Sequence, residues 1–167
     1  MSDYTVFVKV KPYIAQYFRQ VYGNPARFSK KSFFNLLLSK FITIPPKDCV
    51  FDIKLFDERS NSDEYLQVQL PYCTNKNIYS HNYLTRIGED AIARELRSEF
   101  YLALMTFVRN FLIDGFRQKK TAYINTAIKL FIEKHNLDVD CFNTLLKQYH
   151  RTETVKSRKK RKKKMSF

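Results

Sequence analysis

Glycine and cysteine are scarce in this chain, and each scarcity excludes a class of protein. The 167 residues include three glycines, none of them in a glycine-rich loop of the kind that holds a nucleotide phosphate. The three cysteines, Cys49, Cys73 and Cys141, are an odd number and are widely spaced. They therefore predict buried, reduced thiols rather than a disulfide framework or a zinc knuckle. We expect no nucleotide, metal or other cofactor.

Groups of residues that could catalyse a reaction are equally sparse. The three histidines stand singly, so neither a metal-binding pair nor a Cys-His dyad is predicted. In "DCVFDIKLF", Asp48, Asp52 and Lys54 resemble the D-x-K metal-binding core of restriction-like nucleases. Those folds draw the first acid from well upstream of the D-x-K, whereas only three residues separate the two aspartates here. The prediction is a protein that is not an enzyme, with a metal-dependent nuclease as a minor alternative.

Long apolar runs are also missing. No stretch approaches the length needed to cross a bilayer, so no membrane partner is expected. The first residues, "MSDYTVFVKVKPY", lack the basic, apolar and small-residue zones of a secretory signal. An intracellular protein is therefore expected.

Positive charge is what the chain has in abundance, with a net charge of +14. Between Tyr4 and Lys47 there are eight Lys or Arg residues and no acid, whereas residues 48–115 carry seven bases against eleven acids. From Arg151 onward nine bases face one acid. Positive charge at both ends favours a polyanionic partner, because phosphates neutralised by Lys or Arg release condensed counterions.

Residue periodicity predicts an α+β body over residues 1–115. Alternation predicts strands at 5–11, 49–56 and 65–71, with a polar loop at 57–64. Helices are predicted after Pro12, ending at Gly23, and after Ser29 as the N-cap. The result is a small, mainly antiparallel sheet with packed helices. The inward residues of the second and third strands would be Phe51, Ile53, Leu55, Leu66, Val68 and Leu70.

A long helix starting near Gly88 is the most regular element of the body. Its first turn holds Glu89 and Asp90, whose carboxylates complement the helix dipole. Further apolar residues, such as Leu102 and Leu104, widen its apolar surface, so it lies at the centre of the core or packs on a second copy, and a homodimer stays open. Its buried stripe would be Ile92, Leu96, Phe100, Ala103, Phe107 and Phe111.

A helical hairpin is predicted over residues 116–151. Thr121 and Asp140 would cap its two helices, which flank the turn "HNLDVD". The hairpin resembles the helix-turn-helix of DNA-binding proteins, although its turn is longer and more acidic and lacks the usual glycine. The buried residues would be Ile124, Ala127, Ile128, Phe131 and Ile132 in the first helix, and Phe142, Leu145, Leu146 and Tyr149 in the second.

The exposed face of the second hairpin helix carries the candidate DNA-reading residues. Asn and Gln pair bidentately with adenine, and Lys or Arg with guanine, in the major groove. A disordered basic tail over 152–167 would then follow the phosphate backbone. The reading residues are Asn143, Thr144, Lys147, Gln148, His150 and Arg151, and the tail residues are Lys156, Arg158, Lys159, Lys160, Arg161, Lys162, Lys163 and Lys164.

Two other functions stay open beside duplex DNA binding. The N-terminal basic block mixes aromatic and basic residues, as a surface for RNA or single-stranded DNA does. The chain could instead be a structural component whose tail contacts packaged nucleic acid. Small proteins of this composition resemble those encoded by phages and mobile elements, which implies a cytoplasmic, nucleoid-associated location, or a nuclear one in a eukaryote. The secondary binding candidates are Tyr17, Arg19, Tyr22, Arg27, Lys30 and Lys31.

Overall fold

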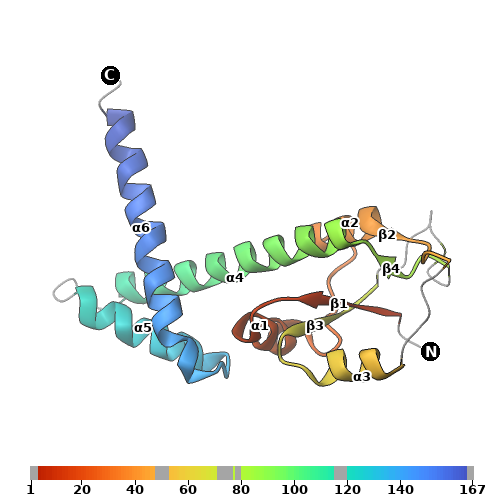
Figure 1. The fold of residues 1–167 in the computed structure, drawn as a ribbon. Coiled ribbons are helices and arrows are strands. Elements are labelled where there is room, and N and C mark those ends of the chain that lie inside the picture. Colours follow the sequence, from red (N-terminus) through yellow and green to blue (C-terminus); the bar gives the residue numbers. More distant parts are fainter. Residues whose placement is uncertain (1–3, 48–52, 71–76, 78–79, 115–119, 165–167) are drawn as a thin grey trace. The chain divides into compact units, whose positions relative to one another are not determined.

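A computed structural model describes residues 4–47, 53–70, 77, 80–114 and 120–164 as an α+β fold. The chain divides into two compact units, Met1–Phe100 and Tyr101–Phe167, so the long helix contributes residues to both. The boundary predicted near residue 115 falls within 115–119, outside the described residues. The described elements are β1 (Thr5–Lys9), α1 (Pro12–Tyr22), α2 (Phe33–Phe41), β2 (Ile42–Thr43), α3 (Ile53–Asn61), β3 (Tyr65–Gln69), β4 (Tyr83–Leu84), α4 (Arg86–Asp114), α5 (Lys120–Lys134), the 3₁₀ turn η1 (Val139–Cys141) and α6 (Phe142–Lys164) (Figure 1).

The sheet of β1 and β3 forms the centre of the first unit. The strands pair antiparallel, with Val6 opposite Val68 and Val8 opposite Leu66. All four side chains are buried, which confirms the alternation expected for both strands. The buried residues of α1, including Ile14 and Phe18, complete this core.

The first two helices begin and end at residues that suit helix ends. Pro12 occupies the first turn of α1, and Gly23 follows its last residue with a φ of 85°, as expected for a glycine stop. The prediction that Ser29 caps α2 was wrong, because Ser32 accepts the bond from the Asn35 N–H. The Asn35 side chain, in turn, donates to the carbonyl oxygens of Phe28 and Ser29 at 2.9 and 2.8 Å.

The strand predicted at 49–56 is wrong where the structure describes it. Residues from Ile53 to Asn61 form helix α3, which also replaces most of the predicted polar loop. Leu55, expected to point inward, is 43% exposed. Phe51 lies outside the described residues, as do Asp48 and Asp52. A short apolar alternation cannot separate strand from helix, and Lys, Leu, Glu and Arg are good helix formers.

A second sheet, of β2 and β4, was missed. Its strands have two residues each, so neither leaves a detectable alternation in the sequence. Together with β1 and β3 this makes two separate two-stranded sheets among the described residues, in place of the predicted single sheet of three strands.

Helix α4 confirms the predicted stripe only in its first half. Ile92, Leu96 and Phe100 are fully buried, but beyond them burial passes to Leu104 and Val108. The expected residues Ala103, Phe107 and Phe111 are only partly buried. Successive steps of four residues move the buried stripe gradually around the helix, because four residues exceed one turn. No described helix is long and apolar enough to cross a membrane.

The second unit packs α5 and α6 against each other, together with residues of α4 from Tyr101 onward. The rings of Phe107 and Phe131 lie 5.4 Å apart in its core. The buried face predicted for α5 is confirmed throughout, whereas in the second helix Phe142 and Leu146 are only partly buried.

Three details of the hairpin differ from the prediction. Thr121 lies within α5 rather than before it. Asp138, not Asp140, supplies the cap, because its side chain accepts the bond from the Asp140 N–H at the start of η1. The expectation of a disordered tail from residue 152 was also wrong, since α6 stays helical to Lys164.

Candidate nucleic-acid interface

Helix α6 is held in place by one buried face. Leu145 and Tyr149 are buried one turn apart, and Cys141 is buried just before the helix begins. The η1 turn leads directly into α6, and Asp138 stabilises the entry by capping that turn. The buried face therefore determines which residues of α6 face away from the unit.

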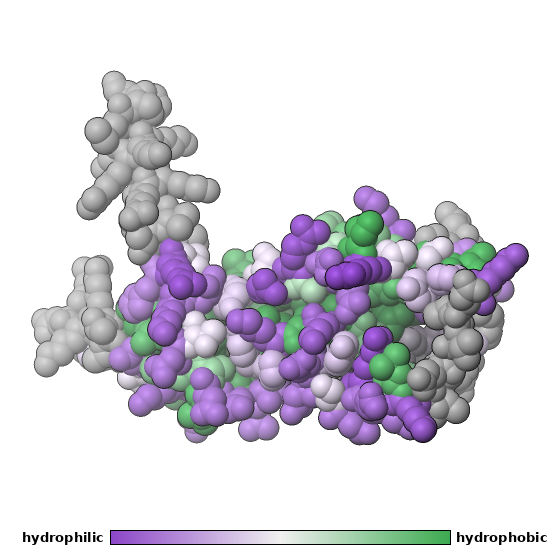
Figure 2. Space-filling view, in the orientation of Figure 1, coloured by the Kyte–Doolittle hydropathy of each residue, from purple (hydrophilic) through white to green (hydrophobic). Residues whose placement is uncertain are grey.

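The predicted reading face is exposed in the structure. Asn143, Thr144, Lys147 and Arg151 are all exposed, and over this part of α6 the visible surface is hydrophilic (Figure 2). Within the described part of the chain, no ion pair involves Lys147 or Arg151. The hydrogen-bonding and positive groups expected on this face are thus accessible.

Gln148 differs from the other predicted reading residues in its exposure, and His150 contacts a neighbouring ring. Gln148 is half-buried, so its amide is less accessible than predicted. His150 is exposed, and its ring meets that of Tyr149 edge-on at 5.8 Å. The structure therefore exposes Asn143, Thr144, Lys147, His150 and Arg151 of the predicted set and leaves Gln148 half-buried.

The single acid of α6 is compensated by an arginine of α4. Arg109 donates to Oε1 of Glu153 at 2.8 Å, and both side chains are partly exposed. Burial raises the pKa of the neighbouring Tyr149 hydroxyl, and the Glu153 charge raises it further. With Glu153 paired, α6 presents no uncompensated negative side chain to a phosphate.

The basic run forms the last turns of this same helix. Every residue of "KSRKKRKKK" from Lys156 to Lys164 except Ser157 is Lys or Arg, and the backbone is helical throughout. The basic residues predicted to contact phosphates therefore belong to the same helix as the residues predicted to read bases.

The N-terminal aromatic residues proposed for base stacking belong to the core instead. Tyr17 is buried, and its ring meets those of Phe18 and Phe100 edge-on at 5.2 Å each. Tyr22 is half-buried and stacks on Phe18 with ring centroids 5.6 Å apart. Burial raises the pKa of both tyrosines. Tyr17, one of the secondary binding candidates, is therefore not exposed for stacking on a base.

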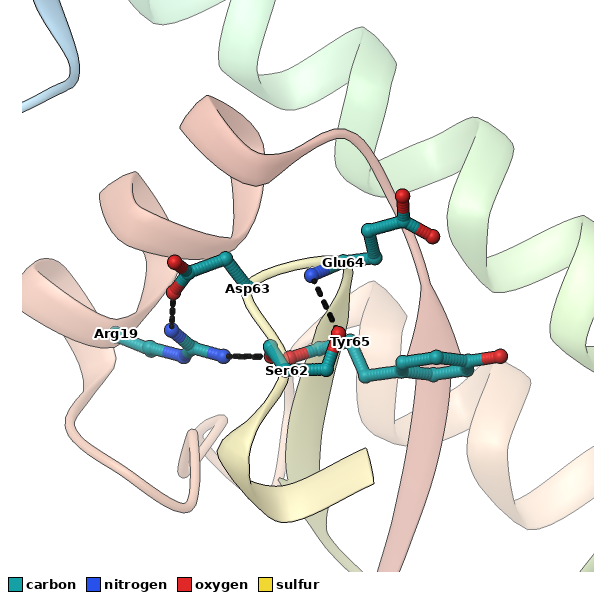
Figure 3. Close-up of polar contacts among 5 residues, drawn as sticks. All are labelled: Arg19, Ser62, Asp63, Glu64 and Tyr65. Carbon is teal, nitrogen blue, oxygen red and sulfur yellow. Dashed lines mark hydrogen bonds and ion pairs between the residues drawn. The ribbon is translucent and has the colours of Figure 1, made fainter. Parts of the chain in front are cut away.

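Arg19 is likewise committed to the fold. Its guanidinium donates to the carbonyl oxygens of Ser62 and Tyr65 at 2.8 Å each, and to Asp63 Oδ1 at 3.0 Å (Figure 3). It therefore ties α1 to the connection between α3 and β3 rather than presenting its charge to a ligand.

The remaining basic residues of this block are exposed. Arg27, Lys30 and Lys31 all lie on the surface between α1 and α2. The exposed ring beside them is Phe33, which is 56% exposed. Sequence spacing did not distinguish it from its buried neighbour Phe34, because both begin the same helix. An N-terminal nucleic-acid surface would thus rest on Phe33 in place of the two tyrosines.

The groups considered for catalysis do not form a site among the described residues. Lys54 is exposed on a helix, so the strand that a D-x-K nuclease core needs is not present there. No group of three His, Cys, Asp or Glu residues in the described part of the chain could hold a metal ion. Burial raises the pKa of the Cys141 thiol to about 11, which disfavours the thiolate that a nucleophile requires.

Comparison with known proteins gave no family: no family model, no curated protein and no solved structure matches the chain. A functional proposal must therefore come from the surface of the molecule itself.

Proposed function

We propose that the protein is a non-enzymatic, duplex-DNA-binding protein that contacts DNA through α6. The observation that carries this proposal is the outer face of α6, where Asn143, Lys147 and Arg151 are exposed, together with the pairing of the helix's one acid, Glu153, with Arg109. Such a face combines base-reading side chains with positive charge and repels no phosphate. A regulator or accessory protein of a phage or mobile element fits this activity, acting at the nucleoid or, in a eukaryote, in the nucleus.

Affinity measured at several salt concentrations tests the electrostatic part. Binding to a duplex should weaken steeply between low and physiological salt, by a few orders of magnitude if several phosphates are contacted. A tail variant with Lys159, Lys160, Lys162 and Lys163 replaced by Gln should show a flatter dependence. Absence of a salt slope in the wild-type protein would contradict a polyanionic partner.

Selection of bound sequences from random pools tests base reading. A motif enriched from duplex DNA should fade in Asn143→Ala, with about 1 to 3 kcal/mol of discrimination lost per base contact. Asn61→Ala, the same change on the exposed end of α3, is the matched control and should leave the motif intact. The tail variant should weaken all duplexes alike. Enrichment from an RNA pool alone would transfer the function to the surface around Lys30, Lys31 and Phe33.

Exposed apolar side chains favour a second candidate, a structural component that assembles with copies of itself. Leu36, on the same face of α2 as Phe33, is 61% exposed, and apolar surface gathers around α2 in Figure 2. Leu102 of α4 is also 61% exposed. It belongs to the apolar surface through which this helix was expected to pack either in the core or on a second copy. This role predicts large assemblies and no enriched sequence in either pool, whereas a regulator should be a monomer or dimer with a preferred site.

A further inference from the structure

The length of α6 is a feature that a helix-turn-helix with a flexible arm does not need. The helix runs for 23 residues, from Phe142 to Lys164. At about 1.5 Å per residue this is roughly 34 Å, close to one turn of B-form DNA. Within the second unit, the last turns of α6 extend well past α5 (Figure 1).

The last turns of α6 carry a density of positive charge that a polyanionic partner would neutralise. After Glu153 the helix contains no acid, and each Lys or Arg from Lys156 to Lys164 has another Lys or Arg three or four residues away. Like charges three and four residues apart destabilise an isolated helix, and the helix dipole offsets only part of this near its C-terminus. A polyanion lying along the helix would remove the repulsion.

Helical spacing places part of the basic run, residues 156–164, on the same face of α6 as the first reading residues. Positions 158 and 161, both arginines, fall in the same angular sector of a helix as Asn143 and Lys147. One continuous helix would therefore place positions 158 and 161 on the side of the helix that holds positions 143 and 147. A flexible arm would have no such register.

We propose that α6 lies in the major groove of duplex DNA as one unbroken helix, with residues 143–151 reading base edges and residues 156–164 contacting phosphates of the same groove. This inference rests on the proposed function and adds the binding mode. It requires that the helix stay continuous between Glu153 and Arg158, because a kink there would turn the basic turns out of the groove.

Ser157 allows a test that changes no charge. Ser157→Pro removes the backbone donor to residue 153 and breaks the helix between its two parts, while Ser157→Ala preserves it. In the full-length protein, Ser157→Pro should weaken duplex affinity by about tenfold or more, and Ser157→Ala should bind like wild type. Addition of duplex should also increase the helical circular dichroism signal of the wild type more than that of Ser157→Pro.

Each outcome bears on one of the two proposals. Equal duplex affinity of the proline and alanine variants, with the steep salt dependence retained, would overturn the continuous helix and leave DNA binding intact. Failure of the wild-type protein to bind duplex at low salt would overturn DNA binding itself. A thermal melt unchanged by Ser157→Pro confirms that any loss of affinity does not come from unfolding of α5 and the first turns of α6.

Discussion

Arg19 shows how one charged residue of a basic surface becomes part of a scaffold. Its guanidinium satisfies two backbone carbonyls, at Ser62 and Tyr65, where the chain leaves α3 and enters β3. Its Nε atom is buried and has no hydrogen-bond partner among the described residues. A planar fork with several donors can bridge neighbouring carbonyls in a way that a lysine cannot. Net charge alone therefore overstates the positive surface of the first unit.

Gly88 shows a second constraint at the residue scale, because its neighbours leave little room for a side chain. A Cβ atom added there would lie 2.5 Å from Cβ of Phe41 and 3.0 Å from Leu84, so α4 approaches these residues as closely as it does because residue 88 is glycine.

Gly88→Ala should therefore lower the free energy of unfolding, by about 1 to 3 kcal/mol from overpacking. Helix propensity alone predicts the opposite sign, a gain of about 1 kcal/mol from alanine. Urea unfolding monitored by circular dichroism decides between the two effects. Ser98→Ala, at an exposed position of the same helix, is the control and should be neutral or slightly stabilising. Stabilisation by Gly88→Ala would show that Phe41 moves aside easily.

At the scale of elements, α5 ends at an asparagine in the left-handed conformation, in the turn that leads to η1. Asn136 has a φ of 45°, in the left-handed region, directly after the last turn of α5. The Leu137 N–H returns to the Ile132 carbonyl at 2.9 Å, and the Asn136 N–H returns to Glu133 at 3.1 Å. This is the bond pattern of a Schellman-type helix stop, for which asparagine is the usual substitute for glycine.

The change in stability on substitution of Asn136 should therefore depend on how well the new residue tolerates the left-handed backbone. Asn136→Gly should stabilise the hairpin slightly or leave it unchanged, and Asn136→Ala should cost about 1 kcal/mol because of its Cβ in the left-handed region. Comparison of the two thermal melts under identical conditions measures the difference. If alanine were as stable as glycine, the left-handed turn would not be needed to connect α5 to η1.

At the scale of the whole molecule, the net positive charge lowers the stability of the free protein. The chain carries +14, concentrated at its two ends, and the acids lie mainly in the middle. High net charge destabilises a compact state through self-repulsion, and dissolved salt screens it.

Salt should therefore have opposite effects on folding and on binding. Added sodium chloride should raise the melting temperature of the free protein by about a few degrees, since about 1 kcal/mol corresponds to that shift in a domain of this size. The same addition should weaken duplex binding. The tail variant, with four fewer positive charges, should show a smaller rise. A melting temperature that falls with sodium chloride would mean that attractive ion pairs, such as Arg109 with Glu153, outweigh the repulsion.

Local pattern in the sequence determined a large part of this protein. The alternation of β1 and β3, Pro12 and Gly23 at the ends of α1, the buried face of α5 and the exposed Asn143, Lys147 and Arg151 were all predicted, because each depends on periodicity or on one residue's backbone preference. The DNA-binding role assigned to that face stays a prediction.

Tertiary structure alone decided the features that depend on distant neighbours. Residues 53–61 became a helix, Arg19 turned to the backbone near Tyr65, and Tyr17 packed against Phe100. The two-residue pairing of β2 with β4 likewise joins segments far apart in the chain. Nothing in the local sequence specifies such partners, because burial and hydrogen bonding are energies of contact between segments and exist only once those segments meet.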